Sequence, residues 1–143
     1  MTDTKSLGGL EPHVLSILRI MAGLLFLQHG LNKLFNFPPT ATHAPYHLFS
    51  LSPGLAGLLE TFGSLLLIFG LFTRPVAFLL SGEMAIGYFM VHAPRSFMPF
   101  LNGGDLAILF CFTFLYLAAA GGGCWSLDRL FLGEKASGQL SAA

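Results

Sequence analysis

Apolar residues fall in four long runs along this chain, separated by short polar or proline-containing segments. The runs span about residues 14–35, 55–72, 76–92 and 106–120. A helix of about 20 apolar residues crosses the hydrocarbon core of a bilayer, which is about 30 Å thick. Backbone groups find no hydrogen-bond partner in lipid, so each run is expected to be helical. The pattern predicts an all-α, integral membrane, four-helix transmembrane bundle that forms a single domain over residues 1–143.

Proline and glycine mark the breaks between the runs. Four prolines punctuate the first connection, at positions 38, 39, 45 and 53. Thr73-Arg74-Pro75 predicts a tight break between the second and third runs, and residues 94–104 separate the third from the fourth. Gly121-Gly122-Gly123 indicates the end of the last helix, and residues 126–129 could start a short interfacial helix after it.

Composition supports a membrane environment. The 143-residue chain is 54% hydrophobic and only 10% charged, with a mean hydropathy of +0.71. Soluble domains contain about 25% charged residues. A soluble four-helix protein would also need a polar stripe on every helix, and residues 106–120 carry no charge. Seven basic and seven acidic residues cancel, so no nucleic acid is expected as a partner.

Basic residues near the ends of the runs predict the orientation. The side that holds the N-terminus carries five of them: Lys5, Arg19, Arg74, Arg129 and Lys135. The opposite side carries two, Lys33 and Arg95. Because short cytoplasmic segments are enriched in Lys and Arg, we expect both termini to be cytoplasmic.

Ionisable side chains inside the runs gather in one half of the predicted membrane. Those in the outer half or at its edge are His29, Lys33, Glu60, His92 and Asp105, and Glu83 lies near mid-depth. An ionisable residue at the bilayer centre costs about 2.5–3.5 kcal/mol on insertion scales, so such groups usually pair or line a cavity. Glu60 also shares a helix face with Gly57, Gly63 and Ser64, which predicts that it faces another helix.

Two interpretations of this outer-half cluster stay open. The groups could have a purely structural role and hold the helices together, for example through an ion pair of Lys33 with Glu60 or Asp105. Alternatively they line a pocket for a small polar head group, such as a quinone ring. In that pocket Lys33 and His29 could donate hydrogen bonds to a carbonyl oxygen, and Glu60 or Asp105 could take up a proton.

Other site chemistries have less support. A haem held by His29 and His92 is not expected, because the two lie at only roughly similar depth and His92 is placed at the interface. His43 and His47 are four residues apart but have no third acidic or cysteine ligand, so no metal site is expected. The two cysteines, at 111 and 124, form no Cys-x-x-Cys motif. No residue is assigned a catalytic role.

A string of short motifs in a fixed order resembles a known family. The motifs are His29-Gly30-x-x-Lys33-Leu34-Phe35, Ala56-Gly57-x-x-Glu60-x-x-Gly63, Gly70-Leu71-x-Thr73-Arg74-Pro75, Met84, His92-x-Pro94, Gly104-Asp105-Leu106, Gly121-x-Gly123 and Ser126-Leu127-Asp128. Taken in this order, from about Leu18 to Leu130, they resemble the DoxX family of small bacterial membrane proteins. The resemblance implies four transmembrane helices with both ends in the cytoplasm, and a location in the bacterial cell (inner) membrane.

The resemblance also implies a redox setting. The family takes its name from a subunit of a terminal quinol oxidase system, and relatives are associated with quinone-linked sulfur oxidation and with oxidative or thiol stress. The family motif residues in this chain are His29, Lys33, Glu60, Arg74, His92 and Asp105. Arg74, Ser126 and Asp128 form a motif on the predicted cytoplasmic face. This chain departs from the family in having Asp105 where Glu is common, Ser64 where a second glycine is frequent, and a connection rich in proline and histidine.

These observations favour an accessory, redox-linked membrane subunit over an autonomous enzyme. Quinone is the expected ligand of its outer-half pocket, and its expected partners are other subunits of a membrane complex or further copies of the chain. A purely structural subunit of a larger complex is the alternative. A small transporter is a weaker third class, because four helices enclose only a small cavity.

Overall fold

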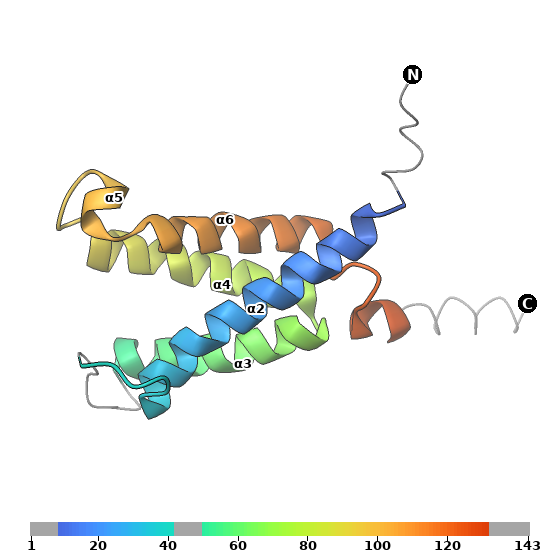
Figure 1. Ribbon diagram of the computed structural model, residues 1–143, viewed down its shortest axis with the longest axis horizontal. Helices are drawn as coiled ribbons and strands as arrows, with labels where there is room; N and C mark the ends of the chain where they lie inside the picture. Colours follow the sequence, from blue (N-terminus) through green and yellow to red (C-terminus); the bar gives the residue numbers. More distant parts are fainter. Residues whose placement is uncertain (1–8, 42–49, 132–143) are drawn as a thin grey trace, which may run out of the picture.

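The computed structural model describes residues 9–41 and 50–131 and is helical in both ranges, without a strand. Its longer helices are α2 (Glu11–Phe35), α3 (Ala56–Phe69), α4 (Thr73–Gly87) and α6 (Asp105–Ala120) (Figure 1). An irregular turn of π type, Leu51–Leu55, precedes α3, and a second one, Tyr88–His92, extends α4. The short helix α5 (Pro99–Asn102) precedes α6. His43 and His47 lie outside the described residues, as do Lys5 and Lys135.

Three helical segments are long and apolar enough to cross a membrane: Glu11–Phe35, Leu51–Phe69 and Thr73–His92. α6 is apolar as well but shorter. The prediction of an all-helical chain with membrane-crossing helices is thus confirmed. The predicted break at Thr73-Arg74-Pro75 is wrong, because these residues already form the first turn of α4 and the connection is 70–72. Pro75 fits there, since the first turn of a helix needs no backbone N–H from it.

The helices pack as two pairs. α2 lies mainly on α3, and α4 lies mainly on α6, whereas fewer contacts join one pair to the other. The α2–α3 contact is close because Gly30 has no side chain: a Cβ atom there would lie 2.6 Å from the backbone nitrogen of Thr61. Small residues allow such approach between helices in lipid. In the second pair, the Ser81 hydroxyl donates to the Cys111 carbonyl of α6 at 2.8 Å.

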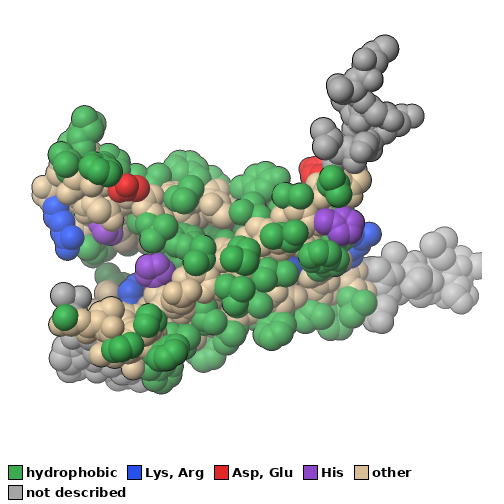
Figure 2. All heavy atoms as spheres, viewed as in Figure 1, with side chains coloured by type: hydrophobic (Ala, Val, Ile, Leu, Met, Phe, Trp, Pro, Cys, Tyr) green, Lys and Arg blue, Asp and Glu red, His purple; other side chains and the backbone are tan. Residues whose placement is uncertain are grey.

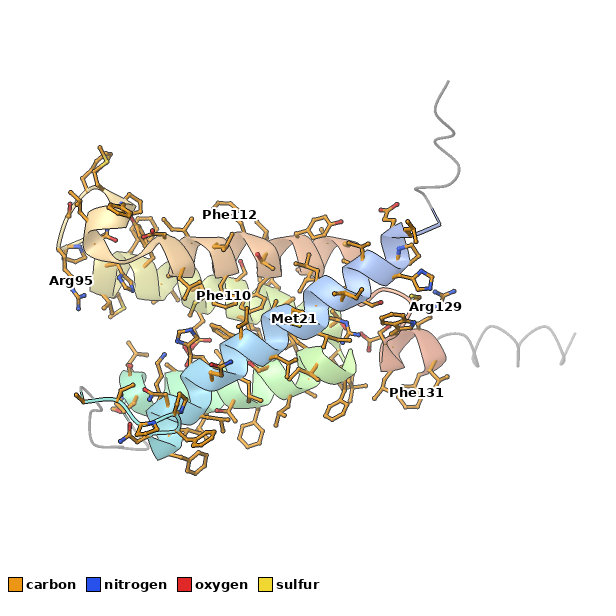
Figure 3. The ribbon with its side chains drawn as sticks, in the orientation of Figure 1. Met21, Arg95, Phe110, Phe112, Arg129 and Phe131 are labelled. Carbon is orange, nitrogen blue, oxygen red and sulfur yellow. The ribbon has the colours of Figure 1, made fainter. Side chains whose placement is uncertain are left out.

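An aromatic cluster fills the space where the two pairs meet. The ring of Phe26 in α2 lies 5.0 Å from that of Phe110 and 4.9 Å from that of Phe114, both in α6. Leu67 of α3 and Leu80 of α4 are fully buried in the same core. Phe110 points inward from α6, whereas Phe112 points away from the bundle (Figure 3) and is 64% exposed, as a lipid-facing side chain would be.

The pairs converge at one end of the molecule, which we call the closed end (Figure 1). Arg19 of α2 is fully buried there, and its guanidinium donates to four backbone carbonyls, those of Leu67, Ile68, Gly122 and Trp125. Two of these carbonyls belong to the last turn of α3, whose carbonyl groups have no partner within the helix. One side chain therefore joins α2, the end of α3 and the segment after α6.

Three further residues cap helices at the closed end. The two carboxylate oxygens of Asp128 accept the backbone N–H groups of Phe72 and Thr73 at 2.7 and 2.8 Å, at the start of α4. The Arg74 guanidinium donates to carbonyls of the last α6 turn, with a distance of 2.6 Å to Ala119. Ser126 Oγ accepts the N–H of Arg129 at the start of a helical turn over residues 127–131, which confirms a short helix at this position.

At the opposite end the two pairs diverge, and we call this the open end (Figure 1). The connection between α4 and α6 is ordered here by Asn102, which donates to the Ser96 carbonyl at 2.8 Å and accepts the Gly104 N–H at 2.8 Å. His92 Nδ1 lies 3.0 Å from the Asn102 carbonyl, and its ring stacks on Tyr88. This network belongs to the α4–α6 pair alone.

Candidate functional site

The surface of the molecule is hollowed between the two helix pairs at the open end. Figure 2 shows basic and histidine side chains around this hollow, while most of the remaining visible surface is apolar. The buried aromatic cluster lies deeper in the bundle than these side chains, and the His29 ring contacts two of its members, Phe26 and Phe110. The hollow thus has polar walls, and a buried aromatic cluster lies next to it.

The strongest interaction in the hollow is an ion pair between α2 and α3. Lys33 Nζ lies 2.5 Å from Glu60 Oε1. Glu60 is 1% exposed, whereas Lys33 is 30% exposed and borders the hollow. The pair therefore has one partner fixed among the helices and one partner within reach of a ligand or water.

Glu83 of α4 lies at the same depth as Glu60. A Cβ atom at Gly63 of α3 would touch the Leu80 side chain of α4. Since α3 and α4 run in opposite directions, Glu60, one turn before Gly63, is level with Glu83, one turn after Leu80. The Glu83 carboxyl is near enough to Glu60 and Lys33 for their charges to interact. All three helices thus contribute an ionisable side chain to one layer, which we call the charged layer (Lys33, Glu60 and Glu83).

Several polar atoms next to this layer are buried without a protein partner. Both Glu83 carboxyl oxygens and Glu60 Oε2 have no hydrogen-bond partner among the described residues. The hydroxyls of Thr61 and Ser64 on α3 likewise have none within residues 9–41 and 50–131. Buried polar groups are nearly always hydrogen-bonded in folded proteins. The unsatisfied atoms therefore mark this layer as a place for a proton, water or ligand.

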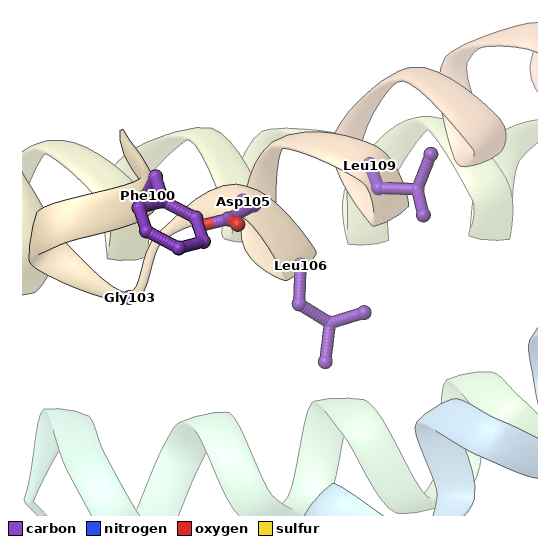
Figure 4. A pocket seen from close by; sticks show the side chains of 5 residues that line it. All are labelled: Phe100, Gly103, Asp105, Leu106 and Leu109. Carbon is purple, nitrogen blue, oxygen red and sulfur yellow. The ribbon is translucent and has the colours of Figure 1, made fainter. Parts of the chain in front are cut away.

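The structure brings together four of the six residues expected in the pocket. His29 precedes Lys33 by one turn of α2, within range of its charge, and Glu60 and Glu83 complete the group. His92 instead belongs to the Asn102 network of the open end. Asp105 is exposed at the start of α6, where it lines a shallow hollow with Phe100, Gly103, Leu106 and Leu109 (Figure 4).

The motif residues of the predicted cytoplasmic face serve a structural purpose. Arg74, Ser126 and Asp128 satisfy helix ends, as described above, and lie at the end of the molecule opposite the charged layer. The role of Arg19 in joining three parts of the chain was not predicted from the sequence, where it counted as a charge near the membrane edge on the same helix stripe as Gly30 and Lys33. Two features of the sequence could have indicated this role. Arg19 lies within an apolar run, and the three consecutive glycines at 121–123 allow a close backbone approach to it.

No group of three or more histidine, cysteine or acidic side chains in the described part of the chain is arranged to hold a metal ion. The charged layer can instead supply an ammonium donor from Lys33 and carboxyl groups that donate or accept a hydrogen bond, according to whether they carry a proton. This set suits a small polar ligand with oxygen atoms.

Comparison with known proteins identifies the family. The profile of the DoxX family matches residues 14–93, which include most of α2, all of α3 and α4, and all of the charged layer. The chain belongs to the DoxX family. It is therefore a membrane protein, and the resemblance noted from the motifs is confirmed.

Two relatives extend the DoxX match over most of the chain. An uncharacterised protein of Haemophilus influenzae is 42% identical over 124 residues, which cover 85% of this chain and 92% of the relative. A Bacillus subtilis protein named "Putative oxidoreductase CatD" is 28% identical over 127 residues, covering 88% of this chain and 92% of the relative. No solved structure matches the chain.

Proposed function

We propose that this DoxX protein is a redox-linked subunit of the bacterial cell (inner) membrane that binds a quinone head group at the open end. α6 would be its fourth transmembrane helix, and both termini would be cytoplasmic. The observation that carries the proposal is the charged layer beside an open hollow and a buried aromatic cluster. The name of the Bacillus subtilis relative is consistent with redox chemistry.

The arrangement matches the needs of a quinone ring. The exposed His29 packs on Phe26 and Phe110, so a bound quinone ring would lie next to a buried aromatic cluster. Lys33, 30% exposed, can donate a charge-assisted hydrogen bond to a quinone oxygen. His29, also exposed, is a second donor or acceptor one helical turn away.

Equilibrium binding of a short-chain ubiquinone to the purified protein in mild detergent tests this proposal. A hydrogen bond to a charged group contributes about 1.5–3 kcal/mol, so Lys33→Met should weaken quinone binding by about tenfold or more. Arg129→Gln removes the same charge from an exposed position at the closed end and should leave binding unchanged. Equal affinity in the wild type and in Lys33→Met would refute the quinone site.

A structural subunit is the second candidate function, and a specific observation favours it. The Lys33–Glu60 pair bridges α2 and α3, so it would hold these two helices together even without a ligand. In that case the exposed apolar helix faces would pack against other subunits. Recovery of a stoichiometric complex after mild detergent extraction, together with no quinone binding, would favour this function.

A further inference from the structure

The charge count of the charged layer does not balance when both carboxyl groups are ionised. Lys33 carries one positive charge, and Glu60 and Glu83 would then carry two negative charges. His29, the other ionisable group near Lys33, adds none when neutral, and α6 contributes the uncharged ring of Phe110 to this level. A net charge buried among helices in a membrane is strongly unfavourable.

Contacts distinguish the two carboxyl groups. Glu60 has the Lys33 ammonium 2.5 Å from one of its oxygens, which stabilises its ionised form. Both oxygens of Glu83 are buried, and no described residue donates a hydrogen bond to either of them. An ionised carboxylate without a donor is the least favourable state for such a group, whereas the neutral acid avoids most of the desolvation cost.

We propose that Lys33, Glu60 and Glu83 form a one-proton site, in which Lys33 stays charged and a single proton, held chiefly by Glu83, is shared between the two carboxyl groups. The site is then electrically neutral as a whole. The proton can exchange with water through the hollow, because Lys33 is 30% exposed there. Binding one proton is a property of the chain without any ligand.

The same acid would act on a bound quinone. A protonated Glu83 can donate a hydrogen bond to a quinone oxygen, beside the bond from Lys33. This second step rests on the proposed function, whereas the one-proton site does not and is measured without quinone. Failure of quinone binding would therefore not contradict the one-proton site. Absence of the one-proton site would likewise not contradict quinone binding.

Infrared spectroscopy of the purified protein in nanodiscs at neutral pH tests the one-proton site. The carbonyl stretch of a protonated carboxyl is separate from that of a carboxylate and shifts when the sample is moved to D₂O. We expect a signal equivalent to one protonated carboxyl in the wild type. It should disappear in Glu83→Gln, and also in Glu60→Gln, where Glu83 would ionise to pair with Lys33.

The opposite change is expected when the positive charge is removed. In Lys33→Met both carboxyl groups should be neutral, so the signal should double. A variant that merely unfolded would expose its carboxyl groups to water and lose signal, so an increase cannot come from misfolding. Glu11→Gln, which removes an exposed carboxyl, should leave the signal unchanged. No signal in the wild type, or an unchanged signal in Lys33→Met, would overturn the proposal.

Discussion

Gly30 of α2 lies directly against the backbone of Thr61 in α3. A Cβ atom at Gly30 would approach the Thr61 nitrogen to 2.6 Å and the Glu60 carbonyl carbon to 3.0 Å. Backbone atoms cannot move aside as the end of a flexible side chain can. This close contact between the two helices lies next to Glu60, so the spacing of α2 and α3 sets the geometry of the charged layer.

Gly30→Ala should separate α2 from α3 and destabilise the protein. Overpacking of this kind typically costs about 1–3 kcal/mol. Gly82→Ala in α4 is the matched control, because a Cβ atom there would meet nothing within 4 Å. The control should be neutral or stabilising by up to about 1 kcal/mol, since alanine favours helix. The measurement is the melting temperature of each variant in mild detergent, and equal values for the two variants would contradict the close contact.

Arg19→Met should destabilise the closed end. It removes the Arg19 donor from four backbone carbonyls, of which, among the described residues, only that of Leu67 keeps another donor, the Gly70 N–H, and each buried unsatisfied group costs about 1–3 kcal/mol. We expect a loss of at least about 3 kcal/mol in the free energy of unfolding, measured by denaturant titration in detergent. Arg19→Lys should be intermediate, because one ammonium has three donors for four acceptors. Arg129→Gln, at an exposed position of the same end, should change stability little.

The Lys33–Glu60 pair should show a measurable coupling energy. A double-mutant cycle with Lys33→Met, Glu60→Gln and the double variant isolates it, and groups in contact usually couple by about 0.5–3 kcal/mol. The double variant should be more stable than the sum of the single losses indicates, because each single change already breaks the Lys33–Glu60 bond and the second has none left to break. Additive losses in thermal stability would show that the pair contributes nothing to holding α2 on α3.

The proposed topology predicts which positions are reachable from outside the cell. In a variant with Cys111 and Cys124 changed to serine, a single Phe97→Cys in the α4–α6 connection should react with a membrane-impermeant thiol reagent on intact spheroplasts. Phe97 is 91% exposed. Arg129→Cys at the closed end should react only after lysis. Reaction of Arg129→Cys on intact spheroplasts, without reaction of Phe97→Cys, would mean the opposite orientation.

The helices could be predicted from the sequence because an apolar run inside a bilayer has few structures open to it other than a helix. The start of α4 could not, since it depends on Asp128 accepting the N–H groups of Phe72 and Thr73 from a distant part of the chain. No local pattern around residue 73 contains that information.

The charged layer could be predicted only in part. Depth along the membrane placed Lys33 and Glu60 in the outer half and Glu83 only near mid-depth, whereas the structure has Glu83 level with Glu60. His92 and Asp105 were expected beside them, but depth says nothing of rotation about a helix axis or of the path of a connection. Asn102, which no motif marks, accounts for the position of His92 at the open end.

The four carbonyls bound by Arg19 also fix an order of events during synthesis. Two of its acceptors lie 48 and 49 residues further along the chain, and the other two lie 103 and 106 residues further along. Arg19 therefore leaves the ribosome long before the backbone that will surround it exists. The hydrogen bonds of Arg19 cannot be completed until almost the whole described chain has been made. Final assembly of the bundle consequently cannot precede the synthesis of residues 122–125.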